Sequence, residues 1–277
     1  MEDTMTSSTS PAESFAIRGS HLIIYLYFDD SKNDDTQLRA VCDRFLQMDS
    51  IHPVATTVVI SDSMPRLTFE EDLTEPIEFG PALSTHQKPP SNRKLLRASF
   101  HSDVIGKVVV GIGRTYADLP TNIANPVTVV MNSSEIDQAS VFPDDPDIQR
   151  RAATCGTFVA TTFRQLCESF SPLYAVITVE SPFPTPRDLI DMSFVEPIGD
   201  LFFSHRVLDV DPSLEQALRE AYSEGYVAEW DTGTYYSAWA PLNPLKRTVQ
   251  PNPMKSSPVA REVLSSAMSA LFPSLSR

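Results

Sequence analysis

The chain has 277 residues, 42% hydrophobic and 21% charged, which fits one large globular domain or two small ones. Its formal charge of −14 argues against nucleic acid as a partner and favours a basic protein, a cationic ligand or a divalent metal, although solubility alone also explains such a charge. No apolar run reaches the roughly 18 residues of a membrane span, so we expect a soluble protein of the cytoplasm with no membrane partner.

The first half of the chain predicts one central strand, a helix and further strands. Residues 1–16 are rich in serine and threonine and lack the features of a secretory signal, so we expect a disordered tail. The run His21–Phe28 is apolar throughout and predicts a buried, central strand. Asp34 and Asp35 are expected to cap a helix whose apolar positions, at helical spacing, run from Leu38 to Leu46. Further strands are expected at Val54–Ile60, Leu95–Phe100, Val108–Ile112 and Val127–Met131.

The second half adds most of the predicted helices. The polar residues 133–147 contain two prolines, and we interpret them as a connection between an N-terminal half (17–140) and a C-terminal half (141–277), with one continuous domain as the alternative. Beyond the connection we expect a helix from Asp147 to about Phe170, strands at Leu173–Val179 and Leu201–Val207, and helices at Arg187–Met192, Pro212–Glu224 and Val259–Leu271. The clearest helix signals are Asp211 as N-cap, Pro212 in the first turn and Gly225 as C-cap.

These elements predict an α+β fold. We expect a mixed, largely antiparallel sheet with helices packed mainly on one face, ending in a β-hairpin and a C-terminal helix. The three cysteines are too few and too scattered for a disulfide framework, so buried free thiols are expected.

The predicted hairpin contains both tryptophans of the protein. A two-residue loop at positions 232–233 would pair Trp230 with Tyr235 and Tyr226 with Trp239. All four aromatic side chains would then share one face. Tyrosine and tryptophan are enriched in interfaces but also suit a core, and the mixed character of the opposite face favours the core. A partner-binding face is the alternative.

Charge is separated into two blocks between positions 69 and 101. The acidic block 69–78 includes Glu70, Glu71 and Asp72 and no base, whereas the block 79–101 has four bases and no acid. The two blocks can neutralise each other. Otherwise the acidic residues are candidates for binding a basic partner.

Two acidic residues follow the predicted central strand. Asp29 and Asp30 end the first buried strand much as Glu180 ends the strand at Leu173–Val179. If these strands are parallel neighbours, the three carboxylates converge at one sheet edge, where Mg²⁺ or Ca²⁺ could bind. Helix capping and solubility explain Asp29 and Asp30 without a metal.

Common catalytic signatures are absent from the sequence. The triplet Asp231-Thr232-Gly233 is the one that aspartic proteases use, but its flanks differ and a hairpin turn explains it. No dinucleotide fingerprint, nucleophile elbow or metal-binding histidine motif occurs, so no cofactor is expected.

The sequence therefore predicts a non-enzymatic, acidic protein-binding module. Such a module would neutralise a basic partner, as an inhibitor or immunity protein neutralises a toxin. The first alternative is a carboxylate- or metal-dependent enzyme with a site near Asp29, Asp30 and Glu180. The second is a structural subunit whose proline-rich arm, residues 241–258, wraps a neighbour.

Overall fold

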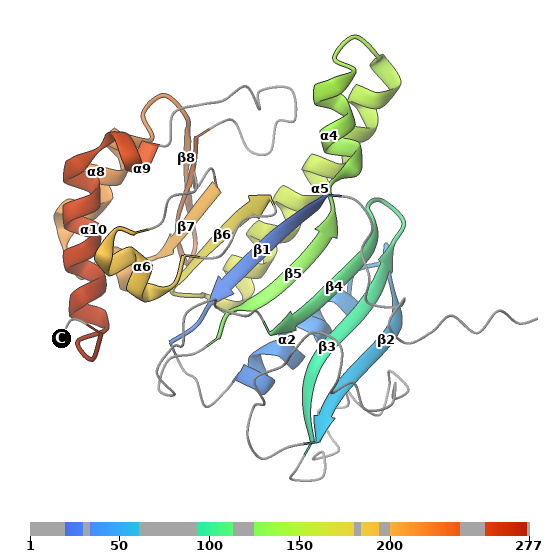
Figure 1. Cartoon of the computed structure of the whole chain (residues 1–277), viewed down its shortest axis with the longest axis horizontal. Coiled ribbons are helices and arrows are strands. Elements are labelled where there is room, and N and C mark those ends of the chain that lie inside the picture. Colours follow the sequence, from blue (N-terminus) through green and yellow to red (C-terminus); the bar gives the residue numbers. More distant parts are fainter. Residues whose placement is uncertain are drawn as a thin grey trace, which may run out of the picture.

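The computed structural model describes residues 20–29, 34–60, 93–112, 125–179, 184–193, 200–238 and 253–275. In these ranges the strands form one antiparallel sheet in the order β2-β3-β4-β5-β1-β6-β7-β9-β8 (Figure 1). The strands are β1 (His21–Tyr27), β2 (Ile51–Ile60), β3 (Arg93–Ser102), β4 (Gly106–Ile112), β5 (Val127–Asn132), β6 (Tyr174–Val179), β7 (Asp200–Ser204), β8 (Tyr226–Trp230) and β9 (Gly233–Ser237). The predicted fold class, an α+β protein ending in a strand pair and a C-terminal helix, is confirmed.

The helices lie between and after these strands. They are α2 (Asp34–Leu46), α4 (Ser134–Val141), α5 (Pro146–Phe170), α6 (Pro186–Asp191), α7 (His205–Leu208), α8 (Pro212–Ala221), α9 (Pro253–Ser256) and α10 (Pro258–Leu271). Four of them begin with a proline that follows an N-cap side chain: Asp145 caps α5, Thr185 caps α6, Asp211 caps α8 and Ser257 caps α10.

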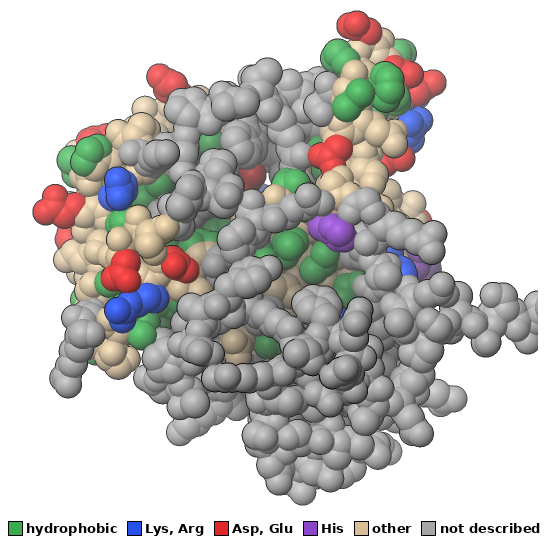
Figure 2. Space-filling view, in the orientation of Figure 1, with side chains coloured by type: hydrophobic (Ala, Val, Ile, Leu, Met, Phe, Trp, Pro, Cys, Tyr) green, Lys and Arg blue, Asp and Glu red, His purple; other side chains and the backbone are tan. Residues whose placement is uncertain are grey.

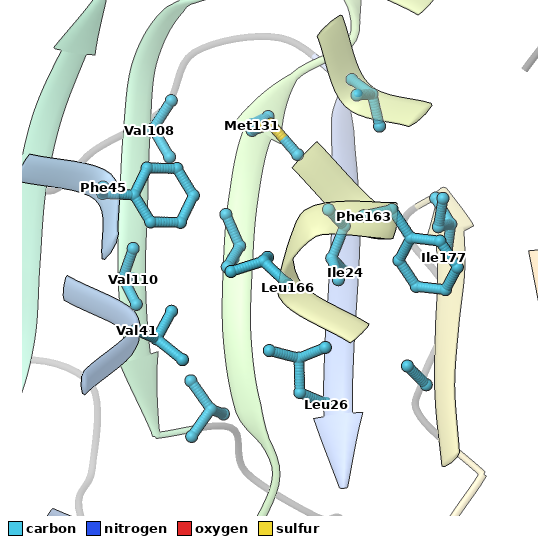
Figure 3. Close-up of a cluster of buried hydrophobic side chains, with 14 of the residues drawn as sticks. Ile24, Leu26, Val41, Phe45, Val108, Val110, Met131, Phe163, Leu166 and Ile177 are labelled. Carbon is cyan, nitrogen blue, oxygen red and sulfur yellow. The ribbon is translucent and has the colours of Figure 1, made fainter. Parts of the chain in front are cut away.

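Strand β1 is central, as predicted, and it lies between β5 and β6. On one face Leu22, Ile24 and Leu26 pack with α2 and α5 (Figure 3). On the other face Tyr25 and Tyr27 pack with α6, α8 and α10. The helices thus cover both faces of the sheet rather than mainly one. A strand that is apolar at nearly every position requires cover on both sides.

Some element boundaries differ from the predictions. The strand expected to reach Val207 ends at Ser204, and α7 begins at His205. The connection predicted at 133–147 contains α4, and Asp145 rather than Asp147 caps α5. Gly225 is not the C-cap of α8, because this helix ends at Ala221 and its C-cap is Tyr222. All three cysteines are buried free thiols, as expected.

Candidate binding surfaces

The hairpin forms where it was predicted but in a different register. Its turn is Asp231-Thr232, so Trp230 lies opposite Gly233 and Ala228 lies opposite Tyr235. The predicted pairing of Trp230 with Tyr235 is therefore wrong by two residues. Because side chains alternate with a period of two, this shift leaves Tyr226, Trp230 and Tyr235 on one face. Trp239 lies outside the described residues.

Gly233 fixes how β9 lies against β7. A Cβ at this position would lie 2.1 Å from the carbonyl oxygen of Phe203 and 2.6 Å from the Cα of Ser204. The φ angle of Gly233 is not positive, so the residue is not needed to make a left-handed turn. Glycine is required here because β9 passes too close to β7 for any side chain.

The aromatic face of the hairpin packs mostly inward. The Trp230 ring stacks on Tyr235, with centroids 4.8 Å apart, and on Phe202, with centroids 5.6 Å apart. Phe163 of α5 meets Trp230 and Tyr235 edge to face. Tyr235 is only 3% exposed, whereas Tyr226 is 41% exposed. Tyr235 therefore belongs to the core, and Tyr226 with the uncovered part of Trp230 remains at the surface.

The Tyr235 hydroxyl donates a hydrogen bond to the buried carboxylate of Asp200. Burial and the nearby Asp200 charge together raise the pKa of Tyr235 well above its usual value. The hydroxyl therefore stays protonated at neutral pH and remains available as a donor. This bond fixes β9 against β7 and has no exposed component.

Asp29 lines a surface cavity of about 350 Å³ at one end of the sheet. Phe28, Phe170 and Leu173 contribute apolar walls to this cavity, and Arg206 contributes a guanidinium. An Arg206 nitrogen lies 2.5 Å from an Asp29 carboxylate oxygen. The Asp29 charge is thus balanced by an arginine. No group of three or more potential metal-ligating side chains lies close together in the described ranges.

The predicted convergence of Asp29, Asp30 and Glu180 rested on parallel strands. Strands β1 and β6 are antiparallel: Tyr27 lies opposite Tyr174, and Val179 lies opposite Leu22. The end of β6 is thus roughly 17 Å along the sheet from the end of β1 that leads to Asp29. Asp30 and Glu180 themselves lie outside the described residues. The parallel arrangement is therefore wrong. The sequence could not reveal this, because an apolar run does not encode strand direction.

Other predicted site residues also lie outside the described residues. Glu70, Glu71 and Asp72 fall in the range 61–92, and most of the proline-rich arm falls in the range 239–252. Their roles in binding a partner stay predictions.

A helical projection extends beyond the end of the sheet. It comprises residues 134–151, which form α4, a short turn and the first turns of α5 (Figure 1). Residues 141–147 are all exposed, including Val141 at 66% and Phe142 at 53%. In Figure 2 hydrophobic and acidic side chains gather at the outer end of the projection, at the upper right of the view.

The turn of the projection is held by specific hydrogen bonds. The side-chain amide of Gln149 donates to the carbonyl oxygens of Ala139 at 2.8 Å and Phe142 at 3.1 Å. The Asp145 carboxylate accepts from the first backbone N–H groups of α5. Ile136 and Ala139 are buried and hold α4 against the body. The exposed turn therefore has a defined shape.

Acidic residues dominate the projection. It carries the five carboxylates of Glu135, Asp137, Asp144, Asp145 and Asp147 against two arginines. Arg150 pairs with Asp147 at 2.9 Å, and Arg151 pairs with Glu135 at 2.8 Å. In the described part of the chain, the Asp144 carboxylate forms no hydrogen bond or ion pair. Both arginines are thus already compensated, and the surface of the projection is negative.

Sequence reasoning missed this projection. The two prolines, Pro143 and Pro146, indicated an irregular connection, and α4 buries only a short apolar stripe, Ile136 and Ala139. One signal was present: the adjacent apolar pair Val141-Phe142 lies directly before a cluster of aspartates in an otherwise polar segment. Such a pair has no covering partner in a simple loop.

Comparison with known proteins gives little further information. No family model matches the chain, and no curated protein matches it. One solved structure is described as the Pseudomonas aeruginosa T6SS protein PA0821. It is 10% identical to this chain with a TM-score of 0.39, and the match covers 93% of this chain and 87% of the other chain. A likeness of this size carries no conclusion about fold or function. Among the described helices, none combines the length and the apolar character that a membrane span requires.

Proposed function

We propose that this protein is a non-enzymatic, acidic protein-binding module that neutralises a basic partner, as an inhibitor or immunity-type protein does. The observation that carries the proposal is the projection 134–151. The projection carries five carboxylates and two arginines, and both arginines are already paired with carboxylates of the projection. The outer residues of the projection are exposed. A negative element standing out from the body is suited to meet a positive surface.

The overall charge supports the same proposal. A net charge of −14 gives the protein a long-range negative field, which accelerates encounter with a basic protein at low ionic strength. Solubility alone would be served by acids spread evenly over the surface. Five of the 36 acidic residues lie within the projection, about twice their average density along the chain, and a local cluster of charge gives specificity as well as steering.

The test is capture of a partner by the immobilised full chain from a lysate of the source organism at low salt. We expect a protein rich in lysine and arginine that is released as salt increases. Asp144→Lys should weaken its binding about tenfold, since one charge is reversed at the contact. Asp144 forms no bond within the described fold, so the substitution should leave folding intact.

The matched control is Glu262→Lys, which makes the same charge change at an exposed position of α10. It should have little effect on binding. Binding that does not depend on salt, or equal weakening by the two substitutions, would contradict the proposal.

A further inference from the structure

The outer end of the projection exposes two large apolar side chains next to each other in the chain, Val141 and Phe142. Phenylalanines elsewhere in the fold, such as Phe45, Phe100 and Phe202, are completely buried. Phe142 is 53% exposed, and covering this exposed half of the side chain would remove further apolar surface from water, which is favourable. The fold leaves this free energy unused at Phe142.

The backbone at Phe142 is held in place by hydrogen bonds. The backbone N–H of Phe142 donates to the carbonyl oxygen of Gln138 at 2.9 Å, and its own carbonyl accepts from the Gln149 side chain. The backbone is therefore fixed, while about half of the side chain is exposed to solvent. Such an anchor loses little conformational freedom when it is bound, which makes it an efficient contact.

The surroundings of the ring restrict what can cover it. Asp144, Asp145 and Asp147 follow in the same exposed stretch, and Glu135 lies on the same projection. A second copy of this chain, with the same excess of acids, would bring like charges together. An anionic lipid surface would be repelled in the same way. The complementary occupant is an apolar pocket with positive charges at its border.

We infer that Phe142, supported by Val141, is the anchor that inserts into an apolar pocket bordered by lysine and arginine on the protein partner. This inference rests on the proposed function and adds to it the contact that supplies most of the affinity. Large side chains at the centre of an interface dominate its binding energy, whereas charges at the rim mainly set the association rate and the salt dependence.

The direct test is photocrosslinking in the source organism. The full chain carries Phe142→p-benzoylphenylalanine, which retains a large aromatic side chain at a position exposed to solvent. We expect one discrete product with another protein, joined at a pocket lined by apolar residues and bordered by lysine and arginine. The matched control is Val259→p-benzoylphenylalanine on α10, a position that is 60% exposed and should give no such product.

Three outcomes of crosslinking would overturn the inference. They are a product joining two copies of this chain, the same product from position 259, and no product from position 142 when low-salt capture does yield a basic partner.

Binding measurements with the captured partner separate this inference from the proposed function. Phe142→Ala should weaken binding about 30-fold with an unchanged salt dependence, while Phe142→Leu should retain most of the affinity. Both should unfold at the wild-type denaturant concentration because the ring is exposed. Normal binding by Phe142→Ala to a basic partner would overturn the anchor but leave the proposed function standing. Failure of the wild type to bind any basic protein would end both.

Discussion

At Gly233 the backbone of β9 approaches β7 so closely that the position tolerates no side chain. The glycine therefore sets the register of β9 against β7, since β9 can lie against β7 only with a glycine opposite Ser204. The turn itself is made by Asp231 and Thr232, neither of which has a positive φ angle. One residue thus fixes where the aromatic side chains of β9 lie along β7.

Gly233→Ala should destabilise the protein by about 2–4 kcal/mol, because the new methyl group would overlap backbone atoms that cannot move independently. Gly106→Ala is the matched control. Gly106 has a φ angle of +76° but open space around its Cβ position, so only backbone strain of about 1 kcal/mol is expected. Urea unfolding of both variants measures the difference. A smaller loss of unfolding free energy for Gly233→Ala than for Gly106→Ala would show that β9 does not pack as described.

At the scale of elements, the projection differs from the rest of the molecule in how it is held. Strands and helices of the body share two continuous layers of buried side chains. By contrast, α4 is attached by a short apolar stripe, the Asp145 cap and the two hydrogen bonds that the Gln149 side chain donates to carbonyl oxygens of α4 and the turn. The shape of the tip therefore depends on a few polar contacts.

Gln149→Ala should loosen the tip without unfolding the body. The Ala139 carbonyl oxygen would lose the Gln149 donor, and the Phe142 carbonyl oxygen would keep only the Asp145 backbone N–H at 3.3 Å, which costs about 1 kcal/mol locally. Hydrogen exchange should accelerate in α4 and remain unchanged in β1. Gln216→Ala, which removes a side-chain contact on the surface of α8, should accelerate exchange in neither. Equal acceleration in α4 and β1 would mean that the projection unfolds only with the whole protein.

For the molecule as a whole, the two buried layers contain tyrosines whose hydroxyl groups are shielded from water. Burial is the main cause that raises the pKa of Tyr174, Tyr222, Tyr235 and Tyr236 above the usual value. Above a pH of about 10 the unfolded chain releases these protons, whereas the folded chain keeps them. The folded state then binds more protons, so stability is complete below that pH and decreases as the pH rises.

We expect the free energy of unfolding to fall by up to about 5 kcal/mol per pH unit above pH 10, since each tyrosine contributes about 1.4 kcal/mol. Tyrosinate absorbance and circular dichroism should therefore change together in one alkaline transition. Tyr236→Phe should reduce the slope by about a quarter. It should cost little at neutral pH because the Tyr236 hydroxyl is buried without a hydrogen-bond partner in the described residues. Tyrosinate formation well before loss of structure would contradict this account.

The sequence predicted local structure better than spatial arrangement. Continuous apolar runs and helical spacing located β1, β6 and α2, because these patterns reflect burial directly. The hairpin register was missed because Gly233 was assigned to the turn. Its close contact is with Phe203 of β7, a strand that is distant in the sequence, so the sequence near the hairpin does not show it. The direction of β6 relative to β1 also could not be inferred from the sequence. Of the candidate site, Tyr226 and Asp29 lie at the surface, whereas the projection was predicted as a plain connection.

The central position of β1 has a consequence for synthesis. Both of its neighbours, β5 and β6, are made much later, since Leu22 pairs with Met131 and with Val179. A ribosome that adds about 5–20 residues per second needs roughly 8–30 seconds to reach the second partner. During that delay an apolar, uncharged segment with high β-propensity is exposed on both faces and both edges, which favours aggregation. The yield of folded protein, as distinct from its stability, therefore depends on how well this segment is shielded until Val179 has been made.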